Sequence, residues 1–186
     1  MDLVLFGIQG SGKGTVASAV AERFGFAYFE TGAELRKLAQ EDTPLAKKVK
    51  SIMDAGNLVP NEVVMEIIEE FMKKVPEGKS VLFDGIPRKP VQATTFDSLM
   101  RKLGRDFTCI LIDVPEEMAK ERLLGRNRSD DTPGVIQARF QNYLDETVPV
   151  IENYRAEGKL LSIDGKPPIP EVRESVFQLI QEKHLA

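Results

Sequence analysis

A glycine-rich segment near the beginning of the chain has the residue types and the spacing of a loop that binds phosphate. Gly7 and the Gly12-Lys13 pair stand at the GxxxxGK spacing. Glycines let successive backbone N–H groups face a chain of phosphates, a following helix adds partial positive charge, and the lysine can reach the terminal phosphates. The residues that we expect to contact these phosphates are Gly10, Ser11, Gly12, Lys13, Gly14 and Thr15.

The segments around this loop predict the elements that must position it. Short apolar runs rich in β-forming residues predict strands at residues 3–6, 27–29, 81–83, 108–114 and 160–163. Helical patterns lie between these runs, and such an alternation predicts a parallel sheet flanked by helices. Because the loop lies between the first strand and a helix that stops at Gly25, a glycine turn without a ligand is the less favoured interpretation.

Two stretches interrupt the alternation of strands and helices. Residues 31–75 predict consecutive helices without a strand, and two apolar helical faces run through them. Residues 126–134 are polar and predict irregular structure, although a helix is predicted to begin near Pro133. We expect each stretch to be a mobile insertion.

Composition limits the classes of protein that the chain can belong to. A length of 186 residues with 42% hydrophobic content predicts one domain, and the net charge of −4 disfavours a general nucleic-acid binder. The single cysteine, Cys109, excludes an intramolecular disulfide and a cysteine-based zinc site, and His184 is expected to be solvated near the chain end. No apolar segment approaches the ~20 residues of a membrane span. We expect a soluble, cytoplasmic protein.

Further segments, in order along nearly the whole chain, resemble the adenylate kinase family. They are the GKGT ending of the loop, residues 30–36, residues 56–60 and residues 83–88 with Gln92. The resemblance implies a P-loop NTPase-type fold, in which a parallel five-stranded sheet is flanked by helices. It also implies a single domain over residues 1–186, with a helical AMP-binding insertion at 30–59 and a short lid at 126–136 that has no zinc site.

The resemblance implies two nucleotide sites. ATP would be bound by the glycine loop together with Arg122, Arg126, Lys166 and Pro167. AMP would be bound by Thr31, Arg36, Asn57, Leu58, Val59, Gly85, Ile86, Pro87, Arg88, Gln92, Arg128 and Arg139. Taken alone, the arginines of residues 122–128 could form a solvated basic face, and Asp164-Gly165 could be an ordinary turn.

Asp84 and Arg88 follow a predicted strand, where ligands bind in open α/β sheets. Alone, they could be a turn aspartate and a surface charge. Next to a phosphate loop, the carboxylate can hold the water shell of Mg²⁺ together with Thr15, and the guanidinium can grip a phosphate through two hydrogen bonds. We therefore expect Mg²⁺ as the cofactor, bound through water.

Two residues favour AMP as the acceptor, and three depart from the family pattern. Thr31 and Gln92 accompany AMP among relatives, and an amide can pair with an adenine edge. The departures are Ala33 in place of aspartate, Glu30 in place of a small residue and Ile86 in place of phenylalanine. The family's aspartate helps to hold water around magnesium, so Ala33 predicts weaker metal positioning.

The expected activity is reversible transfer of the γ-phosphoryl group of MgATP to AMP, giving two ADP, by a monomer. Such transfer needs in-line placement and charge compensation and no general base. The residues expected to supply this are Lys13, Arg88, Arg126, Arg128 and Arg139. The alternatives are a UMP/CMP kinase and a nucleotide-binding regulatory protein without transfer activity. No Asn-Lys-x-Asp sequence is present, which argues against a GTP switch.

Overall fold

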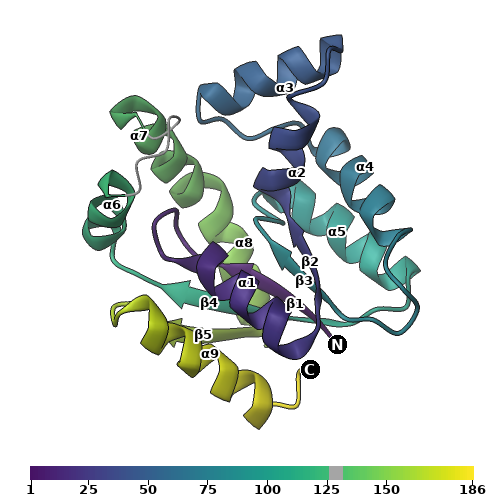
Figure 1. Ribbon diagram of the computed structural model, residues 1–186, viewed down its shortest axis with the longest axis vertical. Helices are drawn as coiled ribbons and strands as arrows, with labels where there is room; N and C mark the ends of the chain where they lie inside the picture. Colours follow the sequence, from purple (N-terminus) through teal and green to yellow (C-terminus); the bar gives the residue numbers. More distant parts are fainter. Residues whose placement is uncertain (126–131) are drawn as a thin grey trace.

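A sheet of five parallel strands forms the centre of the described part of the chain, residues 1–125 and 132–186 of a computed structural model (Figure 1). The strands are β1 (Asp2–Phe6), β2 (Ala27–Glu30), β3 (Val81–Asp84), β4 (Phe107–Asp113) and β5 (Leu160–Asp164). Their order in the sheet is β2-β3-β1-β4-β5. Each predicted strand is confirmed to within a residue at either end.

The strand order places a topological switch at β1. Both its neighbours, β3 and β4, pair with it in parallel, so the chain crosses from one side of β1 to the other between them. In open α/β sheets, ligands bind outside the carboxyl end of the strands at such a point. The glycine loop directly follows β1, so it lies at this position.

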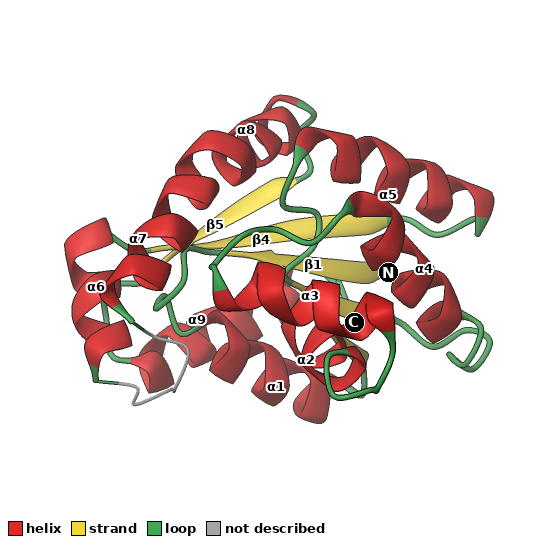
Figure 2. Cartoon of the chain, turned by 90° about the horizontal axis from the view of Figure 1, so that it is seen from above, coloured by secondary structure: helices red, strands yellow, loops and turns green. Residues whose placement is uncertain are grey.

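Helices cover both faces of the sheet (Figure 2). Alternate β1 residues point to opposite sides: Val4 and Phe6 join one buried cluster, and Leu3 and Leu5 join the other. The first cluster packs under α4 (Asn61–Met72), α5 (Pro90–Lys102) and α8 (Val148–Ala156). The second packs under α1 (Lys13–Phe24) and α9 (Ile169–Glu182).

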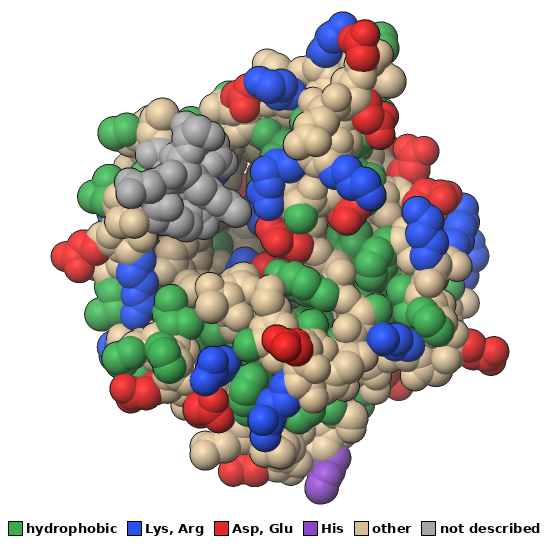
Figure 3. All heavy atoms as spheres, in the orientation of Figure 1, with side chains coloured by type: hydrophobic (Ala, Val, Ile, Leu, Met, Phe, Trp, Pro, Cys, Tyr) green, Lys and Arg blue, Asp and Glu red, His purple; other side chains and the backbone are tan. Residues whose placement is uncertain are grey.

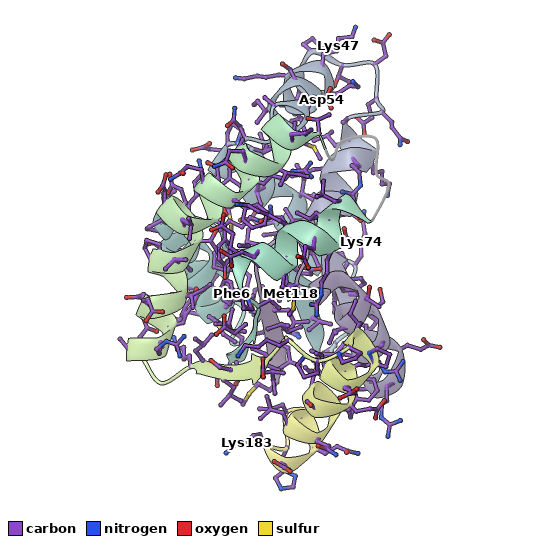
Figure 4. All side chains as sticks on the ribbon, turned by 90° about the vertical axis from the view of Figure 1, so that its left-hand side faces the viewer. Phe6, Lys47, Asp54, Lys74, Met118 and Lys183 are labelled. Carbon is purple, nitrogen blue, oxygen red and sulfur yellow. The ribbon has the colours of Figure 1, made fainter. Side chains whose placement is uncertain are left out.

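The remaining helices lie beyond the sheet. They are α2 (Thr31–Leu38), α3 (Pro44–Asp54), α6 (Glu116–Leu124) and α7 (Pro133–Asn142), with one π-helical turn, η1 (Tyr143–Thr147), between α7 and α8. The run of helices without a strand over residues 31–75 is thus confirmed as α2, α3 and α4. In Figure 4, Lys47 and Asp54 mark α3 at one end of the molecule, and Lys183 marks the opposite end.

Local sequence signals set several helix boundaries. Gly25 ends α1 in the left-handed conformation, with φ of 73°. Thr43 caps α3 by accepting a hydrogen bond of 3.0 Å from the Ala46 N–H. Thr132 does the same for α7, just before Pro133, so the helix predicted near Pro133 is confirmed.

A buried carboxylate ties the sheet together at the end remote from the glycine loop. Asp2 is 1% exposed and accepts hydrogen bonds from the Val81 N–H at 2.7 Å and from two Arg105 nitrogens at 2.6 Å each. Donation of these bonds to the Asp2 carboxylate raises the pKa of Arg105. Within the described ranges, no helix is long and apolar enough to cross a membrane.

Candidate active site

A cavity of about 820 Å³ opens at the carboxyl end of the sheet. It is lined by the glycine loop, by β3 and the loop after it, by α2 and the α3–α4 connection, and by α7 and η1. On the face seen in Figure 3, basic and acidic side chains stand next to one another below α3, beside a hollow in the surface. This volume lies within the range of cavities that bind small molecules and cofactors.

Most residues expected to bind nucleotide line this one cavity. On the ATP side they are Gly10, Ser11, Gly12, Lys13, Gly14, Thr15 and Arg122. On the AMP side they are Thr31, Arg36, Asn57, Leu58, Val59, Gly85, Arg88, Gln92 and Arg139. Ile86 and Pro87 instead line a small adjoining cavity of about 40 Å³.

Packing requires glycine at two positions of the loop. Gly10 and Gly12 have φ of 90° and 85°, a region that side chains disfavour. A Cβ at Gly10 would lie 2.2 Å from the Ala119 carbonyl oxygen, and one at Gly12 would lie 3.0 Å from Ile169. The loop is therefore clamped between α6 and the start of α9, which fixes the direction of its N–H groups.

Lys13 and Asp84 join the loop to the end of β3. The Lys13 Nζ lies 2.5 Å from the Asp84 Oδ1, and the Tyr28 hydroxyl donates to the Asp84 Oδ2 at 3.2 Å. The Asp84 side chain is only 4% exposed, so these two donors compensate a buried negative charge. Burial and then Asp84 raise the pKa of Tyr28, which keeps the hydroxyl a proton donor.

Arg88 is held in place by its own loop and by η1. Its Nε donates to the Gly85 carbonyl at 2.9 Å, and its backbone N–H donates to the Gln92 Oε1 at 2.9 Å. Its carbonyl accepts a bond of 3.0 Å from the Thr147 hydroxyl. Burial lowers the pKa of the Arg88 guanidinium, Asp84 opposes this, and Arg139 adds to the lowering. Arg88 and Arg139 therefore lie close enough for their positive charges to repel each other.

Arg122 connects three segments around the loop. It donates to the carbonyls of Ser11 at 3.5 Å and Gly165 at 3.1 Å, and to those of Lys166 at 3.2 Å and Pro167 at 3.3 Å. The resemblance implies that Arg122 binds ATP, and in the structure its guanidinium donates to these backbone carbonyls. Lys166 and Pro167 do not line the large cavity, but their carbonyls accept hydrogen bonds from Arg122, which does.

Several buried polar atoms in the cavity have no hydrogen-bond partner among the residues that the structure describes. They include the Thr31 hydroxyl, the Ser11 hydroxyl and the Gln9 Oε1. Buried polar atoms are normally paired, because leaving one unpaired costs roughly 1–3 kcal/mol. Unpaired groups on both sides of one cavity fit a polar ligand in each half.

The acidic residues of the cavity fit Mg²⁺ only as a hydrated ion that is also bound to nucleotide phosphates. The described ranges hold no group of three or more His, Cys, Asp or Glu that could bind a metal ion by itself. Asp84 and the exposed Thr15 both line the cavity, and Mg²⁺ commonly keeps several waters and binds through one or two carboxylates plus phosphates. These two residues suit such a hydrated ion.

Some residues that line the cavity or contact its lining carry no motif that would mark them in the sequence. Tyr28 lies in β2, two residues before Glu30, and its hydroxyl donates to Asp84. Asn142 donates to the Gly56 carbonyl at 3.2 Å, and this bond joins α7 to the α3–α4 connection. Gly56 is packed against α7, since a Cβ there would lie 3.0 Å from the Val135 oxygen. Arg126, expected in the ATP site, and Arg128, expected in the AMP site, lie outside the described residues, as does most of the predicted lid.

Comparison with known proteins gives one consistent family. Residues 5–159 match the family model described as adenylate kinase. The chain is 36% identical to an adenylate kinase of Stenotrophomonas maltophilia strain R551-3, over 97% of this chain and 100% of the relative. It is 33% identical to one from Kosmotoga olearia, over 97% and 99%, and 36% identical to adenylate kinase 1 of Synechocystis, over 96% of both. This chain belongs to the adenylate kinase family.

Proposed function

We propose that this protein is an adenylate kinase that moves the γ-phosphoryl group of MgATP reversibly to AMP, giving two ADP. The observation that carries the proposal is one continuous cavity that joins the glycine loop to Thr31, Arg36 and Arg88. A P-loop NTPase that only bound or hydrolysed ATP would have no use for the second half. Two nucleotides in one cavity place a donor phosphate next to an acceptor phosphate.

Each half supplies a different part of the reaction. The N–H groups of the glycine loop and Lys13 hold the donor's phosphates, while Arg36 and Arg88 orient the acceptor's phosphate. Arg88 and Arg139, together with Arg126 and Arg128, compensate the charge that spreads over the oxygens of the moving group. Bound Mg²⁺ would be held through water by Asp84 and Thr15 and would neutralise phosphate charge.

Exclusion of water is proposed as the purpose of the two insertions. Parts of residues 30–59 line one wall of the cavity, and α7, which contains the last residues of the proposed lid (126–136), lines another. The bond from Asn142 to Gly56 already links these walls. Their closure over both nucleotides would direct the phosphoryl group to AMP rather than to water.

The proposal includes a monomer in the cytoplasm. One chain supplies both halves of the cavity, so the mechanism needs no residue from a second copy. The buried thiol of Cys109 is free of any disulfide, which suits a reducing compartment.

An acceptor panel tests this proposal. Purified protein with MgATP is given AMP, CMP, UMP or GMP in separate reactions, and the diphosphate products are measured. We expect the highest kcat/KM with AMP. Faster transfer to CMP or UMP would overturn the choice of acceptor, and binding of ATP and AMP without any transfer would show a regulatory protein.

A further inference from the structure

Glu30 places a negative charge in the half of the cavity proposed to bind the acceptor. It is the last residue of β2, and its Oε1 lies 2.8 Å from the Nη2 of Arg36 in α2. The side chains of Glu30 and Arg36 are 34% and 41% exposed, respectively, and both residues line the large cavity. The ion pair is therefore partly exposed and forms part of the cavity lining.

The backbone between the two partners leaves room for this ion pair. A Cβ at Gly32 would lie 3.0 Å from the Arg36 Nη1 and 3.5 Å from the Glu30 Oε1. Contacts at 3.0 Å are tighter than ordinary packing, so a side chain at this position would press on the guanidinium. Gly32 thus lets Arg36 turn back toward the end of β2.

Two carboxylates stand side by side at this edge of the sheet. Glu30 is the direct register partner of Asp84 on the neighbouring strand. Asp84 is compensated by Lys13 and Tyr28, and Glu30 is compensated by Arg36. Each acid therefore has its own donors, and a phosphate that reaches Arg36 meets a neutral pair rather than an uncompensated cation.

The charges of the pair also reach Arg88, the other proposed acceptor-binding arginine. Burial has the largest effect on the pKa of Arg88 and lowers it. Glu30 raises that pKa and Arg36 lowers it, so the two members act in opposite directions at the same place. Glu30, Arg36 and Arg88 thus share one electrostatic environment.

We infer that Glu30 determines the affinity for the acceptor by acting through Arg36. This inference rests on the proposed function. Before the acceptor binds, Glu30 holds the guanidinium; when the monophosphate enters, its dianionic phosphate takes Arg36 from Glu30. Binding of the acceptor must therefore break one ion pair, whereas binding of ATP at the glycine loop does not. Glu30 thus competes with the acceptor's phosphate for Arg36 and takes no part in the transfer.

Calorimetric titration of AMP in the absence of ATP tests the inference on the Glu30→Gln variant. The amide keeps the shape of the side chain but removes its charge, so we expect AMP to bind about two- to fivefold more tightly, as the loss of a partly exposed ion pair allows. The affinity for ATP should stay unchanged. Glu41→Gln, which removes the same charge from an exposed residue just beyond α2, should leave both affinities unchanged.

The same titration in an Arg36→Gln background shows whether Arg36 carries the effect. We expect the gain from Glu30→Gln to vanish there. A gain that persists would mean that Glu30 repels phosphate directly. Weaker AMP binding in Glu30→Gln would mean that the pair prepares Arg36 for phosphate, and unchanged binding would mean that Glu30 has no effect on the acceptor. Each of these results overturns the inference.

Two controls keep the test interpretable. Circular dichroism and thermal unfolding check that each variant folds, and Glu30→Ser replaces Glu30→Gln if the latter does not. Failure of the proposed function gives a different result: wild-type protein would then bind no AMP or would transfer no phosphoryl group from MgATP to AMP. An AMP affinity unaltered by Glu30→Gln in an active kinase would contradict only the role of Glu30.

Discussion

Lys13 of the glycine loop and Asp84 at the end of β3 form an ion pair with an Nζ–Oδ1 distance of 2.5 Å, and the Asp84 side chain is 4% exposed. Both residues line the cavity that contains the two proposed nucleotide sites. The ion pair therefore serves the fold and the chemistry together, and these two roles can be separated by experiment.

Replacing Lys13 with methionine should reduce both turnover and stability. Turnover should fall about 10²- to 10³-fold, because a cation aimed at the transferring phosphates is lost. The free energy of unfolding should fall by roughly 1–3 kcal/mol, since Asp84 keeps only the bond from Tyr28. Urea unfolding and steady-state kinetics measure the two effects.

The double variant Lys13→Met with Asp84→Asn separates the two roles. A neutral amide in place of the buried acid should regain much of the lost stability, whereas turnover should stay low. Recovery of turnover along with stability would contradict the proposed contact of Lys13 with phosphate.

Arg88→Ala should lower turnover by about 10²-fold or more while leaving the affinity for ATP nearly intact. The reason is its position between Gly85 and Gln92, in the acceptor half of the cavity. Single-turnover kinetics and a separate ATP titration provide the comparison. A mild loss of activity would show that this arginine does not reach the moving group.

Tyr28→Phe should weaken the binding of Mg²⁺ in the active complex, because the Asp84 carboxylate loses the hydrogen bond that fixes its Oδ2. The hydroxyl donates to the Asp84 Oδ2 at 3.2 Å, so its loss should cost about 1 kcal/mol of stability and raise the Mg²⁺ concentration needed for half-maximal rate a few-fold. Tyr154→Phe is the matched control: it removes a bond of 2.7 Å to Asp97, outside the cavity. An equal magnesium effect in both variants would refute the role of Tyr28.

Arg122→Ala should raise the KM for MgATP about tenfold and leave the KM for AMP unchanged. The side chain holds the carbonyls of the glycine loop and of residues 165–167, so its loss loosens the donor half alone. Lys120→Ala on the same helix, which pairs with Glu116 at 2.5 Å, should change neither KM. Equal increases in the KM for MgATP and the KM for AMP would show that Arg122 does not act on the ATP half alone.

The strands and the glycine loop could be predicted from the sequence because their signals are local. β-rich apolar runs mark the strands, and glycines such as Gly10 and Gly12 are required by backbone geometry that the motif encodes. The consecutive helices of residues 31–75 followed from their apolar faces in the same way. One residue on those faces, Leu45, is nevertheless 41% exposed.

Contacts between distant segments could not be predicted, since no local pattern encodes them. The bond from Tyr28 to Asp84 depends on strand order, and the bond from Asn142 to Gly56 depends on how α7 meets the α3–α4 connection. The π-helical turn that places Thr147 against Arg88 has no sequence signal that we recognise. Glu30 stood out only as a departure from the family pattern, and its partner became visible in three dimensions.

Incubation of the purified protein with MgADP as its sole nucleotide tests the central claim most directly. An adenylate kinase run in reverse must convert two ADP into one ATP and one AMP, so the account predicts equimolar ATP and AMP by anion-exchange chromatography. Chelation of the magnesium should slow the conversion strongly. No conversion of MgADP, or formation of AMP with free phosphate in place of ATP, would contradict the account.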